Sequence, residues 1–128
     1  MTINDYRNQT ANIVAFDESK PNQDYQLWFH QDEGYIVAKA TDNMAMALEG
    51  DAIGPDVNII NTPRVPNNDY QKWRIVKHGG TLVSISPKLD NSYAMTLKDG
   101  SNRPGTEVVL TKIENNIPTG KQLWKFTQ

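Results

Sequence analysis

Gln26-Leu27-Trp28-Phe29, Gln71-Lys72-Trp73-Arg74-Ile75 and Gln122-Leu123-Trp124-Lys125-Phe126 share one pattern. In each stretch a glutamine stands two residues before a tryptophan, and an apolar residue follows the tryptophan within two positions. The tryptophans lie 45 and 51 residues apart, and the chain has no others. Self-similarity of this length is typical of an internally repeated fold. The sequence therefore predicts one domain, residues 1–128, made of three repeats at approximately 1–30, 31–77 and 78–128.

Upstream of each motif the same register continues. A methionine opens three equivalent triplets, which are Met1-Thr2-Ile3, Met46-Ala47-Leu48 and Met95-Thr96-Leu97. About ten residues later come three apolar runs, which we align as Ile13-Val14-Ala15-Phe16, Val57-Asn58-Ile59-Ile60 and Val108-Val109-Leu110-Thr111. Short apolar runs separated by Gly, Pro, Asn and Asp indicate strands joined by turns, so the sequence predicts an all-β fold.

The first repeat is shorter than the other two. The second predicts four strands, near 34–39, 44–49, 57–61 and 70–76, and the third predicts four more, near 81–86, 93–98, 106–111 and 122–127. The first predicts three, near 1–5, 12–16 and 25–30, which makes about eleven strands where threefold symmetry needs twelve. Either the chain is truncated or one strand is missing, with its place open or filled by a partner chain. An unpaired edge exposes backbone donors and acceptors, so we expect a protein partner or self-association at the incomplete repeat.

Composition excludes several classes of function. The 128 residues carry 13 basic and 15 acidic side chains, a net charge of −2, which argues against non-specific nucleic-acid binding. Cysteine is absent, so disulfides, thiol catalysis and thiolate metal sites are excluded. No apolar window is long enough to cross a bilayer. The N-terminus lacks the features of a signal peptide, which leaves a cytoplasmic protein and one exported without a classical signal as alternatives.

Three repeats that each end in Gln-x-Trp resemble the ricin B-chain type of β-trefoil, the (QxW)3 lectin family. The resemblance implies a six-stranded barrel capped by three hairpins, with the tryptophans in a shared core. It also implies a non-enzymatic role in binding galactose- or N-acetylgalactosamine-type glycans, as in agglutinins and toxin subunits. The motif itself is structural, because tryptophan contributes a large apolar area and the glutamine amide can satisfy turn backbone groups. Function inferred from it is therefore an analogy between folds.

The sugar-contacting positions of the family are poorly kept. The family has an acid in the second strand, an aromatic ring at the end of the third, and an Asn before Gln-x-Trp. The acid positions here are Thr2, Ala47 and Thr96, and the aromatic positions are Phe16, Ile60 and Thr111. The amide positions are Tyr25, Tyr70 and Lys121. No repeat keeps the full set, so we expect weak individual sites that act through multivalency.

Candidate sugar-binding residues nevertheless remain in two repeats. The first repeat offers Phe16 as a stacking ring, with Asn4, Asp5, Asp17, Asp24 and Tyr25 as polar partners. The second offers Glu49, Asp51, Asn61, Asp69 and Tyr70. The third, with Asp99, Asn102, Lys112 and Lys121, is the least suited to a neutral sugar, and its Asp99-Gly100 pair predicts a turn.

No catalytic, cofactor or metal motif is present. His30 and His78 fall in different predicted hairpin turns without a carboxylate at ligand spacing, so we expect no enzymatic activity, no cofactor and no bound metal. Two hypotheses follow. The first is a non-catalytic lectin. The alternative is a β-trefoil protein-binding module, an inhibitor or a toxin accessory or receptor-binding subunit, whose sugar sites have decayed.

Overall fold

The computed structural model describes residues 1–3, 11–14, 28–38, 44–80, 82–101 and 105–125, and these ranges contain eleven strands. The strands are β1 (Thr2–Ile3), β2 (Ala11–Val14), β3 (Trp28–His30), β4 (Ile36–Ala38), β5 (Met44–Leu48), β6 (Ile59–Pro63), β7 (Trp73–Lys77), β8 (Leu82–Pro87), β9 (Tyr93–Leu97), β10 (Val108–Lys112) and β11 (Trp124–Lys125). Within the described ranges the helical segments are single 3₁₀ turns of three residues. The predicted all-β fold is confirmed.

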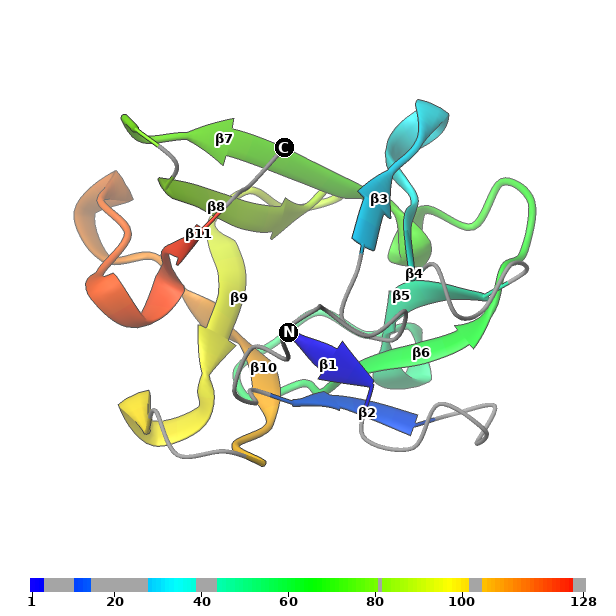
Figure 1. The fold of residues 1–128 in the computed structure, drawn as a ribbon, viewed down its shortest axis with the longest axis horizontal. Coiled ribbons are helices and arrows are strands. Elements are labelled where there is room, and N and C mark those ends of the chain that lie inside the picture. The colour runs from blue at the N-terminus through cyan, green and yellow to red at the C-terminus, as the bar shows by residue number, and fades with distance from the viewer. Residues whose placement is uncertain (4–10, 15–27, 39–43, 81, 102–104, 126–128) are drawn as a thin grey trace, which may run out of the picture.

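The three predicted repeats each contribute one antiparallel hairpin, β1–β2, β5–β6 and β9–β10, and Figure 1 shows β1–β2 between the other two. The second strands of these hairpins meet one another. β2 pairs with β6 through Ala11 and Asn61, and Asn58, the residue before β6, forms an isolated bridge with Val109 of β10. The amide of Leu110 also donates to the carbonyl of Val57, at 2.8 Å. The three predicted repeats therefore converge through equivalent strands.

The register of the second hairpin differs from the predicted alignment. Leu48 pairs with Ile59, and Leu97 pairs with Val108, so Ile59 and Val108 are the equivalent residues. The prediction aligned Val57 with Val108, which is wrong by two positions. Val57 is apolar but precedes β6, and its backbone is bonded to β10 of the next repeat. The position equivalent to Thr111 is therefore Thr62 and not Ile60.

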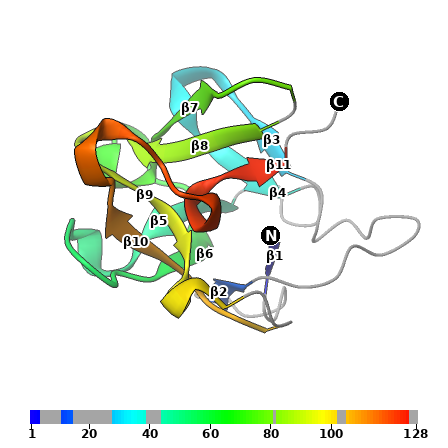
Figure 2. The ribbon, with the colours of Figure 1, turned by 90° about the vertical axis from the view of Figure 1, so that its left-hand side faces the viewer.

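The remaining strands build the barrel. β3 pairs with β4 and β7 with β8 as hairpins, and β11 pairs with β8. Figure 2 shows these strands gathered on one side of the three capping hairpins. In the first repeat β1 is equivalent to β5 and β9, so the described residues contain no counterpart of β4 and β8 there. The expectation that the first repeat lacks its first strand is confirmed within those residues.

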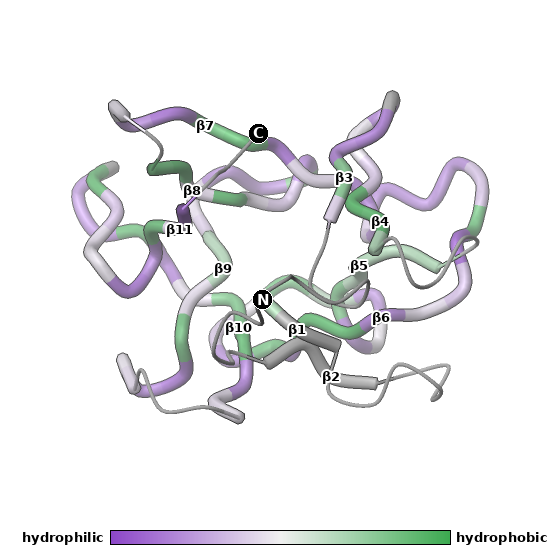
Figure 3. The backbone as a smooth tube through the Cα atoms, in the orientation of Figure 1, coloured by the Kyte–Doolittle hydropathy of each residue, from purple (hydrophilic) through white to green (hydrophobic). Residues whose placement is uncertain are grey.

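The core lies between the barrel and the caps. Its buried side chains include Met46, Leu48 and Ile59 from the second repeat and Met95 and Val108 from the third. Figure 3 shows the hydrophobic residues concentrated in the strands around the centre and the hydrophilic ones in the outer loops. Burial of this apolar surface is the main stabilising contribution. The described part of the chain has no helix of the length and apolarity that a membrane span requires.

Candidate functional site

The three tryptophans make the same hydrogen bond. The indole N–H groups of Trp28, Trp73 and Trp124 donate to the carbonyls of Met1, Met46 and Met95, at 2.8, 3.0 and 3.1 Å. Each bond ties the last strand of a repeat to the capping hairpin of the same repeat. The predicted structural role of the tryptophans and the predicted equivalence of the three methionines are both confirmed.

The glutamine of the motif is also structural in the two repeats where it is described. Gln71 is buried, accepts a hydrogen bond from the Val65 amide and donates one to the Pro63 carbonyl. Gln122 accepts from the Thr119 amide and donates to the carbonyl of Lys112, the residue equivalent to Pro63. The glutamines hold the loops that follow β6 and β10. Gln26 lies outside the described residues.

The family's acid and aromatic positions in the third repeat are bonded to each other. The hydroxyls of Thr96 and Thr111 lie 2.6 Å apart, and Thr96 also donates to the Ala94 carbonyl. The amide of Gln122 donates to the Thr111 hydroxyl at 3.1 Å. Thr96 is 1% exposed. These polar groups are therefore satisfied within the protein, with Thr96 and Gln122 buried and Thr111 partly buried.

The described candidates of the second repeat occupy three different places. Glu49 is exposed at the turn of the β5–β6 hairpin, while Asn61 is fully buried on β6, so that its side chain faces the interior. Asp69 and Tyr70 lie side by side on the 3₁₀ turn Asp69–Gln71 before β7. Asp69 forms an ion pair with Lys72 at 3.3 Å, and Tyr70 packs against the core. The family's acid position in this repeat, Ala47, is buried.

Other predicted residues are placed in turns or fall outside the described part of the chain. Asp51 and Asp99 have left-handed backbones, with φ of 49° and 55°, and Gly100 follows at 67°, which confirms the turn predicted at Asp99-Gly100. Lys112 and Lys121 are exposed. The candidates that lie outside the described residues are Asn4, Asp5, Phe16, Asp17, Asp24, Tyr25 and Asn102.

Both histidines are bonded within the protein. Nε2 of His30 donates to the Trp73 carbonyl at 3.2 Å, and Nε2 of His78 lies 2.7 Å from the Ser84 hydroxyl. Ser84 is 3% exposed, while His78 is exposed in the loop after β7. The described residues contain no group of three or more His, Cys, Asp or Glu side chains that could hold a metal ion.

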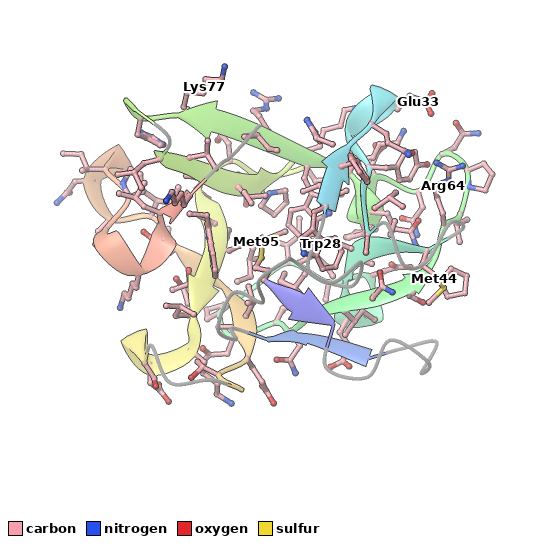
Figure 4. All side chains as sticks on the ribbon, in the orientation of Figure 1. Trp28, Glu33, Met44, Arg64, Lys77 and Met95 are labelled. Carbon is pink, nitrogen blue, oxygen red and sulfur yellow. The ribbon has the colours of Figure 1, made fainter. Side chains whose placement is uncertain are left out.

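The structure forms a cleft that sequence reasoning missed. Its volume is about 580 Å³, and it is lined by His30, Gln31, Glu33, Tyr35, Arg64 and Pro66. Figure 4 places Glu33 at the tip of the β3–β4 hairpin and Arg64 on the neighbouring loop after β6. No spacing in the sequence signals this site, because its two halves are some thirty residues apart and meet only through the fold.

Comparison with known proteins identifies the fold. No protein-family model matches the chain, and no curated protein matches its sequence. Among solved structures, the chain is similar to ThreeFoil, a designed threefold symmetric protein, with a TM-score of 0.84 and 20% identity over 98% of this chain and 87% of that one. It is similar to the C-half of an earthworm R-type lectin, solved in complex with GalNAc, with a TM-score of 0.72 and 20% identity over 99% and 88%.

A third similarity is to a much larger protein. A mosquitocidal holotoxin matches with a TM-score of 0.78 and 15% identity, over 97% of this chain and 15% of the holotoxin. Together these similarities show that the chain has a β-trefoil fold.

Proposed function

We propose that this protein is a non-catalytic carbohydrate-binding lectin for galactose- or N-acetylgalactosamine-type glycans. The observation that carries the proposal is the similarity, over nearly the whole of both chains, to a lectin domain solved with GalNAc bound. The binding pockets are shallow and depart from the family's pattern. Because the sites are weak individually, several of them on one rigid body raise the apparent affinity for a multivalent glycan.

The first two repeats are the proposed sugar-binding repeats. Phe16 and its polar neighbours supply the stacking ring and the hydrogen-bonding groups of the first pocket. In the second repeat the adjacent pair Asp69 and Tyr70 supplies the proposed contacts, and exposed Glu49, at the β5–β6 turn, is a separate candidate. The third repeat is set aside because Thr96 and Thr111 are bonded to each other.

A glycan array, with competition by lactose and N-acetylgalactosamine, tests the proposal. We expect binding to galactose-type glycans that both competitors displace. An array without binding would contradict the lectin function and favour the protein-binding alternative described below.

Replacement of the predicted stacking ring tests the first pocket. We expect Phe16→Ala to abolish binding to galactose-type glycans while the far-UV circular dichroism spectrum stays unchanged, since stacking on the sugar's apolar face is lost. Phe29→Ala is the matched control, because Phe29 is an exposed phenylalanine outside the proposed pocket. Unchanged glycan binding by Phe16→Ala would show that the first-repeat pocket is the wrong choice.

The alternative function is a protein-binding module, an inhibitor or a toxin accessory or receptor-binding subunit. Two observations favour it: the family's acid is replaced by buried Ala47 and Thr96, and the chain matches a segment of a holotoxin. The proposed contact surface is the incomplete first repeat, which would bind a protein partner or a second copy of this chain. Sedimentation across a range of protein concentrations tests self-association, and a monomer at every concentration would contradict it.

A further inference from the structure

The cleft between the β3–β4 hairpin and the loop after β6 has rigid walls. The Tyr35 hydroxyl donates to the Val65 carbonyl at 3.0 Å, and the Val65 amide is held by Gln71. Gly34, with φ of 98°, packs so closely that a Cβ there would lie 3.0 Å from the Trp73 carbonyl oxygen. Both sides of the cleft are therefore anchored to the Gln-x-Trp motif of the second repeat.

The guanidinium of Arg64 is oriented by two neighbours. Nη1 donates to Oε1 of Gln31 at 2.9 Å, and the group lies 5.3 Å from the centre of the Tyr35 ring. Tyr35 is itself only 4% exposed, so it positions Arg64 without offering its own ring to a ligand. Among the residues that the structure describes, Arg64 has no carboxylate partner and its other N–H groups have no acceptor.

An acidic side chain faces the same cleft without neutralising this arginine. Glu33 is exposed and lines the cleft, yet it forms no ion pair with Arg64 within the described residues. Lys72, whose Nζ lies 5.8 Å from the centre of the Tyr35 ring, is already paired with Asp69. The cleft thus presents the planar guanidinium of Arg64 on one wall and the carboxylate of Glu33, which can accept hydrogen bonds from hydroxyl groups, on the other.

The third repeat provides an internal comparison for this cleft. The strand registers make Ile75, Val76 and Ser84 equivalent to His30, Gln31 and Tyr35, and the hairpin registers make Ile113 equivalent to Arg64. The same backbone scaffold is therefore built with apolar or small residues at these positions. The polar lining of the second-repeat cleft is not required by the fold.

From this arrangement we infer that the cleft binds an acidic monosaccharide, a sugar ring that carries a carboxylate. Arg64 pairs with the carboxylate, because the planar guanidinium matches carboxylate geometry through two parallel hydrogen bonds. Glu33 accepts hydrogen bonds from ring hydroxyls, and Pro66 contacts the apolar face of the ring. The choice of a sugar rests on the proposed carbohydrate-binding function, but the cleft is separate from the pockets assigned there to galactose-type glycans.

Titration of the ¹⁵N-labelled protein with glucuronate, followed by the amide resonances of Gln31, Tyr35 and Val65, tests the inference. The comparison ligands are glucose, the methyl ester of glucuronic acid and acetate. We expect glucuronate to bind at least about tenfold more tightly than glucose or the ester, since both lack the charged group. Equal binding of glucose, or equal binding of acetate, would overturn the inference.

Single substitutions test the contribution of each wall of the cleft to glucuronate binding. We expect Arg64→Gln to weaken glucuronate binding at least about tenfold and Arg64→Lys to be intermediate, because lysine keeps the charge without the fork. Lys77→Gln removes the same charge at the far end of β7 and should leave binding unchanged (Figure 4). Glu33→Gln should weaken glucuronate but not acetate. Glucuronate binding that is unchanged in Arg64→Gln would overturn the inference.

The outcome is distinguishable from that of the proposed function. Arg64→Gln should retain the binding of lactose and N-acetylgalactosamine on the array. If neither the natural protein nor the variants bind galactose-type glycans, but glucuronate still binds, the galactose proposal alone is contradicted. If galactose-type glycans bind but glucuronate does not, only the inference that the cleft binds an acidic monosaccharide is contradicted.

Discussion

The second and third repeats share a hydrogen-bonded scaffold and differ in what they present on it. In both, the tryptophan bonds to a methionine carbonyl and the glutamine holds the loop after the third strand. At equivalent positions the second repeat carries Tyr35 and Arg64, while the third carries Ser84 and Ile113. Positions shared by the repeats therefore serve the fold, and positions that differ are those free to serve function.

The three tryptophans differ in how deeply they are buried. Trp73 is 3% exposed, whereas Trp28 and Trp124 are only partly buried against the core. β7, which carries Trp73, is the last strand of the second repeat, which has all four strands. β3 ends the first repeat, which has three strands among the described residues, and β11 ends the third.

The largest expected effect tests this difference in burial. Trp73→Ala should lower the free energy of unfolding by about 3–5 kcal/mol, because it removes a fully packed indole and its hydrogen bond to Met46. Trp124→Ala should cost clearly less, since its side chain is partly exposed. Urea unfolding followed by far-UV circular dichroism measures both. Equal losses of unfolding free energy would show that Trp73 and Trp124 are equally well packed.

A second prediction concerns the threonine pair of the third repeat. Thr96→Val and Thr111→Val should each cost about 1–2 kcal/mol, because each leaves the other hydroxyl with a lost partner. A double-mutant cycle should give a coupling energy of roughly 1 kcal/mol. Thr62→Val is the matched control in the second repeat, where Ala47 stands in place of Thr96. A coupling energy of zero would contradict a stabilising hydrogen bond between the two threonines.

The smallest expected effect on the free energy of unfolding comes from Asp90 in the β8–β9 turn. The side chain and the backbone amide of Ser92 both donate to Asp90, and these hydrogen bonds lower the pKa of Asp90 below its ordinary value. The resulting stabilisation is present above the pKa of the unfolded chain and is lost as the pH falls through the lower, folded-state pKa. Since solvent screens this carboxylate, we expect it to be worth about 0.5 kcal/mol or less.

Unfolding measured at neutral pH and at pH values below about 4, where carboxylates protonate, checks this prediction. Asp90→Asn should be slightly less stable than the natural protein at neutral pH, and the difference should shrink in acid. The second repeat has Thr41 at the equivalent sequence position, so Thr41→Ala is a control without a titrating group. A difference that grows in acid would contradict the assignment.

The sequence by itself determined the architecture, because the motifs that define it are local and recur. The spacing of the tryptophans and the methionine triplets predicted the repeats, the strands and the shortened first repeat. The prediction was wrong at Val57, where an apolar residue before β6 was read as part of the strand. The register of β6 depends on its pairing with β5, and the position of Val57 depends on its bond to β10; no local sequence pattern indicates either contact.

The chemistry of the surface was decided only by the tertiary structure. Asn61 looked like a polar sugar contact in the sequence, but the pairing of β5 with β6 turns it into the interior. Gln31, Tyr35 and Arg64 carry no common motif, and they form one cleft because the barrel hairpin and a capping loop are brought together by Gln71 and Val65. Periodicity follows from backbone geometry and is readable along the chain, whereas a binding cleft depends on contacts between distant segments.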